Sequence, residues 1–379
     1  MESRRQIVDA KRVVIKIGSN VLWGSNDGPR RALAQEVAEA VADGRAQGRD
    51  VVVVSSGAVS AGRKKLGERR PLENLDISSK QALAAVGQVE LMRFWQDVFA
   101  ERNLPVGQVL VTRDVVSVRQ RFINARHTLG TLLKRQVTPI INENDTVAAD
   151  EIRLGDNDHL SAVAAQLLDA ELLILLTDID GLYTKDPRVD PSAELIPLVT
   201  MDDTETSFDA GKSRSGLGLG GMSTKVSAAR MAARSGASTI IANGTRPGVL
   251  HRILAGETEG TLFVPDEASM RARKRWLLLQ DAPGGELVVD DGARRALIER
   301  GTSLLPSGVI DVRGHFGQGD AVQVLSEKGD LLARGLATYN ADETRRIMGA
   351  KSSQIEAILG YKFGDAVIHR DDLVLVENP

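Results

Sequence analysis

Short apolar runs that end in polar clusters recur in the first part of this chain, and they alternate with helical patterns. The clearest are residues 50–54, DVVVV, and residues 171–176, ELLILL, whose continuous branched apolar side chains are typical of strands covered on both faces. Amphipathic stretches such as residues 32–47 and 80–101 carry apolar side chains at helical spacing. The alternation continues to residue 264 and predicts an α/β domain, with a mostly parallel sheet sandwiched by helices.

Each predicted strand ends in a small polar or glycine-containing cluster. The clusters GSN, SSGA, NEND, TD and NG follow the strands predicted at residues 12–17, 50–54, 138–141, 171–176 and 237–242. Parallel α/β sheets bind ligands in the crevice beyond the carboxyl ends of their strands. The coincidence of polar clusters with strand ends therefore predicts an enzyme whose site lies along that edge of the sheet.

The longest polar cluster, residues 142–158, is crowded with carboxylates and amides. It follows a short apolar strand and leads directly into a helical run at residues 160–168, an arrangement that favours a site over a solvated linker. The plainer alternative is an acidic loop in which Asp156 or Asn157 caps the helix. Matching cations and glycines elsewhere in the chain favour the site.

Residues 215–225, SGLGLGGMSTK, form a glycine-rich stretch that opens a helix. Backbone N–H groups freed by glycine, together with a helix N-terminus, bind anions, and Lys225 stands one turn inside the helix where its ammonium could reach the same anion. Neither familiar nucleotide motif fits. No apolar strand precedes the G-x-G-x-x-G spacing, and Thr206 stands where a P-loop requires glycine. A flexible glycine linker is the alternative.

A second cation, Lys16, lies near the end of the strand predicted at residues 12–17. A buried lysine is costly unless an anion meets it, although its stem could instead lie along the core with the ammonium in solvent. Phosphoryl transfer needs cations on the equatorial oxygens, metal on the nucleotide phosphates, and alignment of donor and acceptor. Two lysines, a glycine cradle and an acidic loop supply that set, with one acid orienting the lysines.

Composition excludes several other classes of protein. The chain has no cysteine, which excludes disulfides, thiolate catalysis and Cys-ligated zinc. Its five histidines are scattered without ligand spacing, so a zinc site is not expected, and no metal-ligating residues are predicted. No apolar run reaches membrane-spanning length, and residues 1–12 lack the apolar stretch of a signal peptide. We therefore expect a cytoplasmic protein. The formal net charge of −3 gives no indication of a membrane or nucleic-acid partner, and none is expected.

After residue 264 the pattern changes. Residues 265–275 are polar and basic, which is typical of a linker, and residues 276–379 contain short apolar strands separated by dense turn signals. This second pattern predicts a small, mainly β domain with one or two helices. The predicted domains are therefore residues 1–264 and 276–379.

Six segments, in order and with matching spacing, resemble the bacterial glutamate 5-kinases, members of the amino acid kinase fold group. They are RVVIKIGSN, VVVVSSGAVSAG, PIINENDTV, GDNDHLSA, LLTDIDGLYTKDPR and GLGLGGMSTK. The similarity covers essentially the whole chain, and the stretch GELVVDDGARRALIERGTSLLPSG looks like part of the PUA domain that bacterial members carry. One departure is visible. Where the family's first loop reads GTS, this chain has Gly18, Ser19 and Asn20; Ser19 keeps the hydroxyl, whereas Asn20 alters the loop.

The resemblance implies a reaction and a set of site residues. The reaction is phosphorylation of the side-chain carboxylate of L-glutamate by ATP with Mg²⁺, the first step of proline biosynthesis. The implied catalytic residues are Lys16, Lys225 and Asp158, the last as organiser of both lysines. The sequence does not separate Asp158 from Asp156 in that organising role. The implied glutamate-binding residues are Ser56, Asp145, Asp156 and Asn157. The implied nucleotide-binding residues are Lys16, Gly18, Thr177, Asp178, Leu219, Gly220, Gly221, Met222, Ser223, Thr224 and Lys225.

The resemblance also implies proline feedback inhibition and a homo-oligomer, either a tetramer or a dimer. The nearest rival is another amino acid kinase, acting on N-acetylglutamate, aspartate, carbamate or UMP; the appended C-terminal domain argues for the glutamate enzyme. PUA domains often contact RNA, but residues 276–379 carry 16 acidic and 11 basic side chains, a formal charge of −5 that disfavours a phosphate backbone. We therefore expect a regulatory or structural role for this domain.

Overall fold

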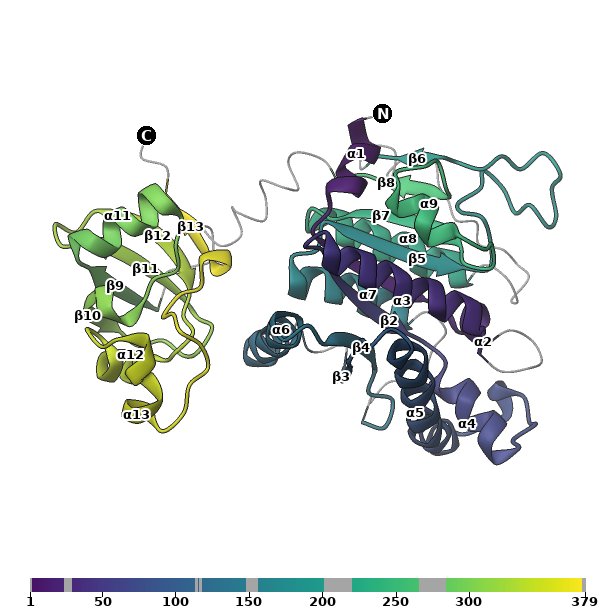
Figure 1. Cartoon of the computed structure of the whole chain (residues 1–379), viewed down its shortest axis with the longest axis horizontal. Coiled ribbons are helices and arrows are strands. Elements are labelled where there is room, and N and C mark those ends of the chain that lie inside the picture. Colours follow the sequence, from purple (N-terminus) through teal and green to yellow (C-terminus); the bar gives the residue numbers. More distant parts are fainter. Residues whose placement is uncertain are drawn as a thin grey trace. The chain divides into compact units, whose positions relative to one another are not determined.

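The computed structural model describes residues 2–23, 29–112, 115, 118–147, 156–200, 220–265 and 284–376. The chain divides into two compact units, Met1–Val116 with Thr128–Met270, and Ser117–His127 with Arg271–Pro379 (Figure 1). From residue 266 onward, the predicted linker at residues 265–275 lies outside the described residues. Each unit has its own sheet and its own core.

A mostly parallel sheet forms the centre of the first unit. Its strands are β1 (Arg12–Ile17), β2 (Asp50–Ser55), β3 (Val106–Val111), β4 (Thr138–Glu143), β5 (Leu172–Thr177), β6 (Leu198–Val199), β7 (Ser238–Asn243) and β8 (Thr261–Phe263). They lie in the order β3-β4-β2-β1-β5-β7-β8-β6, and of these neighbours only β7 and β8 run antiparallel. The mostly parallel α/β sheet expected from the sequence is confirmed.

Helices cover both faces of this sheet (Figure 1). The helices between residues 2 and 254 are α1 (Glu2–Asp9), α2 (Ser19–Trp23), α3 (Arg31–Ala46), α4 (Ala58–Leu66), α5 (Ile77–Ala100), α6 (Arg119–Lys134), α7 (Asp156–Leu168), α8 (Gly220–Arg234) and α9 (Val249–Leu254). Of these, α4 packs on α5, and the first part of α6 belongs to the second unit. On one face, α3, α5 and α9 share a core with Val13, Ile15 and Ile17 of β1. Because side chains alternate along a strand, Lys16 points to the other face, where α7 and α8 pack against each other.

The strand order reverses direction at β1, which has β2 on one side and β5 on the other. The register brings the carboxyl ends of these strands level, because Ile17 pairs with both Ser55 and Leu176. Thr177, the last residue of β5, pairs with Asn243 at the end of β7. The polar clusters that follow the strands therefore lie along one edge, beside the point where ligands bind in such folds. We call this edge of the sheet the carboxyl edge.

The second unit is built on a five-stranded sheet in the order β10-β9-β11-β12-β13. Its elements are β9 (Gly285–Val289), α11 (Asp291–Arg300), β10 (Val309–Gly314), β11 (Ala321–Ser326), β12 (Leu331–Leu336), α12 (Ala341–Ile347), α13 (Ile355–Leu359) and β13 (Leu373–Leu375). Leu287, Val324, Tyr339 and Ile355 belong to its fully buried core. The small, mainly β domain is confirmed, with three α-helices in its described part instead of one or two.

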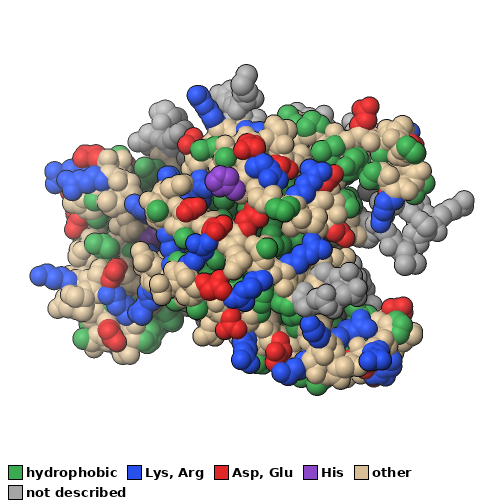
Figure 2. All heavy atoms as spheres, turned by 45° about the vertical axis from the view of Figure 1, so that its right-hand side comes forward, with side chains coloured by type: hydrophobic (Ala, Val, Ile, Leu, Met, Phe, Trp, Pro, Cys, Tyr) green, Lys and Arg blue, Asp and Glu red, His purple; other side chains and the backbone are tan. Residues whose placement is uncertain are grey.

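The surface of the molecule carries charges of both signs. Figure 2 shows one face, on which Lys and Arg side chains are interspersed with Asp and Glu. The face shown therefore differs from the single-signed basic face that attracts a nucleic-acid backbone. Within the described part of the chain, every helix is too short or too polar to cross a membrane.

Helix α4, which the sequence pattern does not predict, packs against α5 with backbone in contact. A Cβ atom at Gly62 would lie 1.9 Å from the carbonyl oxygen of Leu83, and one at Gly87 would lie 1.7 Å from that of Ala58. Only glycine allows such an approach. Because Ala58 begins α4, this contact holds the start of α4, and the end of β2 before it, against α5.

Gly87→Ala is expected to lower the free energy of unfolding by about 1–3 kcal/mol, the usual cost of overpacking, because the two helices must separate. The matched control is Gly130→Ala in α6, where an added Cβ meets nothing within 4 Å. That change is expected to be neutral or stabilising, since alanine favours a helix interior. Urea denaturation of both variants measures the difference, and equal midpoints would contradict the close contact of α4 with α5.

Candidate active site

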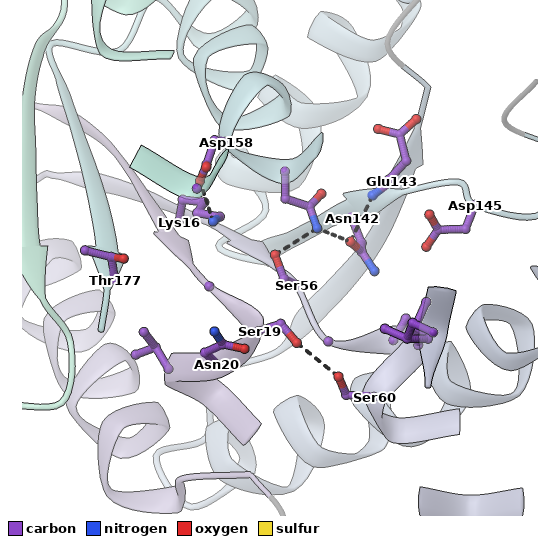
Figure 3. A pocket seen from close by; sticks show the side chains of 18 of the residues that line it. Lys16, Ser19, Asn20, Ser56, Ser60, Asn142, Glu143, Asp145, Asp158 and Thr177 are labelled. Atoms are coloured by element: carbon purple, nitrogen blue, oxygen red, sulfur yellow. Dashed lines mark hydrogen bonds and ion pairs between the residues drawn. The ribbon is translucent and has the colours of Figure 1, made fainter. Parts of the chain in front are cut away.

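A cavity of about 480 Å³ opens at the carboxyl edge of the first sheet (Figure 3). Its lining comes from β1, β4 and β5, from the turns that follow β1, β2, β4 and β5, and from several helices, including α7 and α8. The predicted site residues that line it are Lys16, Gly18, Ser56, Asp145, Asn157, Asp158, Thr177, Asp178, Gly221 and Lys225. One cavity thus gathers residues that the sequence assigns to the amino acid, to the nucleotide and to catalysis.

The other predicted site residues are placed differently. Leu219 lies outside the described residues, and of Asp156 and Gly220 only the backbone is described, at the first positions of α7 and α8. Met222, Ser223 and Thr224 belong to the first turns of α8. None of these three is among the residues that line the cavity in the described part of the chain.

One carboxylate, that of Asp158, joins the two predicted lysines. Lys16 Nζ lies 2.5 Å from Asp158 Oδ1, and Lys225 Nζ lies 3.3 Å from Asp158 Oδ2. The hydroxyl of Thr224 donates to the same Oδ2 at 2.7 Å, and Lys225 also donates to the carbonyl oxygen of Gly221 at 2.8 Å. Ammonium groups from β1 and α8 therefore meet at the first turn of α7. The sequence leaves both Asp156 and Asp158 open as the acid that orients the lysines. In the described structure, the carboxylate that contacts both ammonium groups is that of Asp158.

This cluster of Lys16, Asp158 and Lys225 is almost closed to solvent. The side chain of Asp158 is 0% exposed, that of Lys16 is 5% exposed and that of Lys225 is 12% exposed. Burial alone would raise the pKa of Asp158, but the two lysines outweigh it and hold that pKa below its ordinary value. Burial lowers the pKa of Lys16, and the charge of Asp158 opposes this shift. The N-terminus of α7 adds to the stabilisation of the carboxylate.

One side of the cavity carries amides and hydroxyls. Asn157 donates through Nδ2 to Ser56 Oγ and to Asn142 Oδ1, both at 2.9 Å. Its other atom, Asn157 Oδ1, is buried and has no hydrogen-bond partner in the described structure. Asp145 lies beyond Asn142 on this side (Figure 3), and burial raises the pKa of Asp145 to about 6. This side therefore offers oxygen acceptors to a ligand that carries N–H donors.

Thr177 lies on the opposite side of the Lys16–Asp158 pair from Asp145 (Figure 3). Its hydroxyl donates to Asp178 Oδ1 at 3.2 Å, just after the end of β5. The N-terminus of α8 contributes Gly221 and Lys225 to the same cavity. A helix N-terminus with a lysine in its first turns binds anions such as phosphate. The two sides of the cavity thus differ in the charge of the ligand group that they favour.

The structure adds lining residues that the sequence analysis does not assign. Ser19 and Ser60 face each other with their hydroxyl oxygens 3.1 Å apart, and Glu73 and Lys80 come from the segment before α5 and from α5 itself. Asn142 stands in the polar cluster after a predicted strand, so its position in the sequence could have indicated a site residue. Glu73 and Lys80 follow no strand end, and nothing in their sequence context indicates a site.

Residues 11–243 match the Amino acid kinase family, and residues 285–359 match the PUA domain. The chain is 50% identical over 367 residues to the glutamate 5-kinase of Geobacter sulfurreducens, covering 97% of this chain and 98% of that protein. It is 51% identical over 367 residues to the glutamate 5-kinase of Geobacter metallireducens, with the same shares covered. Among solved structures, a UMP kinase from Bacillus anthracis aligns with a TM-score of 0.46 and 18% identity, covering 68% of this chain and 97% of that chain.

Asp158→Ala is expected to destabilise the fold by about 3–5 kcal/mol, because removing one partner of a buried ion pair leaves the other charge uncompensated. The matched control is Glu90→Ala in α5, which removes the partner of Lys65 in a pair whose side chains are 32% and 55% exposed. Exposed pairs contribute little, so the control should stay close to the parent chain. Equilibrium denaturation compares the two, and a similar loss in both would show that the Asp158 cluster does not anchor this edge.

Proposed function

The chain belongs to the glutamate 5-kinases of the amino acid kinase family, and we propose that it transfers the γ-phosphoryl group of ATP to the side-chain carboxylate of L-glutamate. The product is L-glutamyl 5-phosphate, the first intermediate of proline biosynthesis. The observation that carries the proposal is the meeting of Lys16 and Lys225 at Asp158, in a cavity that has an acceptor-rich side and an anion-binding side.

Lys16 and Lys225 act on the migrating phosphoryl group. A transferring phosphoryl group carries its negative charge on equatorial oxygens, and cations placed beside it stabilise the transition state. Asp158 is ionised and holds both ammonium groups in place, which makes it a positioning residue. The acceptor carboxylate is itself ionised at neutral pH, so the reaction needs no general base. Asp158 can therefore serve the lysines alone.

The acceptor-rich side binds the α-amino end of glutamate. Asn157 Oδ1, which has no partner in the described structure, accepts from the ammonium, and the Asp145 carboxylate supplies the opposite charge. The hydroxyl oxygen of Ser56 already accepts from Asn157, so its hydrogen is left to donate to a substrate carboxylate. Asp156, at the first position of α7, belongs to the same proposed binding set. An N-acylated amino acid would leave these acceptors poorly matched.

The anion-binding side holds ATP through Thr177, Asp178, Gly18 and residues 219–225. Within the described residues, no three His, Cys, Asp or Glu side chains gather as a metal site. Magnesium in such enzymes is held by one or two carboxylates together with phosphate oxygens. Asp178 fits that role because it lines the cavity, whereas Asp158 already holds two lysines. When bound, the ion neutralises charge on the nucleotide phosphates.

The proposed function also includes regulation by proline and assembly into an oligomer. Proline carries the same α-carboxylate as glutamate and a charged amine, so it can compete for the acceptor-rich side as a feedback inhibitor. We include in the proposal a homo-oligomer, a tetramer or a dimer, that works in the cytoplasm. The acidic PUA domain has a regulatory or structural role in it, without a nucleic-acid partner.

The proposal is tested by ADP release with L-glutamate, N-acetylglutamate or L-aspartate as acceptor, with hydroxylamine present to trap an acyl phosphate. We expect ADP and a hydroxamate in equal amounts from L-glutamate when ATP and Mg²⁺ are supplied. ADP without hydroxamate would exclude a carboxylate acceptor. Faster turnover of N-acetylglutamate or aspartate would assign the chain to the rival amino acid kinases.

The apparent KM for glutamate is expected to depend on pH through Asp145. Its pKa is raised to about 6, so this carboxyl loses its negative charge as the pH falls through that value. An ammonium prefers the ionised form, so the KM should rise by about tenfold for each pH unit below the pKa of the free enzyme. Asp145→Asn should raise the KM above that pH and flatten the profile, with the KM for ATP unchanged. An unaltered profile in the variant would remove Asp145 from the glutamate site.

A further inference from the structure

Gln88 is an amide on the buried face of α5. The neighbouring side chains of that face, Leu83, Leu91 and Trp95, are apolar, and Gln88 itself is only 8% exposed. It does not belong to the cavity lining in the described structure. A buried amide costs free energy unless it is hydrogen-bonded. Gln88 Oε1 accepts a hydrogen bond from Asn142 Nδ2 at 2.8 Å. Asn142 lines the cavity, so this bond joins the buried amide to the site.

The hydrogen bonds of Asn142 allow only one orientation of its amide. Its Oδ1 accepts the backbone N–H of Glu143 at 2.9 Å, so its Nδ2 must face Gln88. The same Oδ1 accepts from Asn157 Nδ2, which gives its second hydrogen to Ser56 Oγ. Both hydrogens of Asn157 Nδ2 are then used, and its Oδ1 is the atom left for a ligand.

These side chains link the two faces of the sheet across the carboxyl edge. Gln88 comes from α5 on one face, Asn142 from the end of β4, and Asn157 from the first turn of α7 on the other face. Gly87, the residue before Gln88, is in backbone contact with Ala58 at the start of α4. The position of α5 against the sheet therefore determines where Gln88 Oε1, the acceptor for Asn142, lies.

We propose that Gln88 is a positioning residue that holds Asn142, and through it Asn157, so that an amide oxygen faces the amino group of the acceptor substrate. This inference rests on the proposed function, because it takes glutamate as the acceptor. Gln88 itself does not touch the substrate. Its role is to set selectivity for a free amino group.

Loss of the acceptor at position 88 removes the bond that holds Asn142, and with it the bond that orients the Asn157 amide. Asn142, which is 2% exposed, loses the partner of its Nδ2, and a buried donor without a partner is costly. Asn142 cannot turn over, because the Glu143 N–H still requires its Oδ1, so it shifts toward another acceptor and releases Asn157. The Asn157 amide is then free to present its N–H groups to the cavity. An ammonium has only donors and is disfavoured there, whereas the carbonyl oxygen of an N-acyl group can accept.

Gln88→Met tests the proposal, because methionine keeps the length of the side chain and removes the acceptor. The KM for L-glutamate should rise about tenfold, the value of one hydrogen bond to a charged group, with the KM for ATP unchanged. The ratio of kcat/KM for L-glutamate to that for N-acetylglutamate should fall. Gln88→Glu keeps an oxygen toward Asn142 in either protonation state and should retain the KM and the selectivity of the parent chain. Gln88→Leu is a second deletion of the acceptor, should the methionine variant not fold.

Leu91→Val is the matched control, since it shortens a fully buried side chain on the same helix. It should lower the thermal midpoint without changing the KM for glutamate or the selectivity. If Leu91→Val raised the KM as much as Gln88→Met, or if Gln88→Glu behaved like Gln88→Met, Gln88 would be a structural residue only. A parent chain that forms no hydroxamate from glutamate would instead overturn the proposed function, so the two failures are distinguishable.

Discussion

A carboxylate closed to solvent holds two ammonium groups at the carboxyl edge, and the first unit is arranged around this requirement. The central strand β1 brings Lys16, the first turn of α7 brings Asp158, and the start of α8 brings Lys225. Buried charges persist only where partners compensate the lost hydration. Each of these elements is therefore held in place by the other two, and residues far apart in the chain form one cluster.

The two sides of the cavity follow from the same arrangement. Lys225 and the N-terminus of α8 favour phosphate, while the Asn157 oxygen and Asp145 favour an amine. The Lys16–Asp158 pair lies between Thr177 on one side and Asp145 on the other (Figure 3), so the proposed function keeps the phosphoryl donor apart from the amino end of the acceptor. In the proposed function, an amino acid whose side chain ends in a carboxylate spans that separation with its reactive group toward the lysines.

Much of this fold could be predicted from the sequence, because continuous apolar runs such as residues 50–54 form buried strands and polar clusters mark their ends. The partner of the lysines could not be chosen in advance, since Asp156 and Asp158 both fall in the first turn of one helix. Helix α4 was missed because it packs through the backbone at Gly62, which leaves little apolar periodicity. Gln88 was missed because a single amide within an apolar stripe has no distinguishing spacing.

The backbone contact between α5 and α4 has a consequence for how the protein can change over generations. Gly87 seats the segment that carries Ser56, and the next residue is the one proposed to orient the amides, so one turn of a helix supports the amino-acid side of the cavity. Substitutions in the packing beneath that turn would change the affinity for the amino acid more than the affinity for the nucleotide. Affinity for the two substrates is thus open to separate adjustment by natural selection.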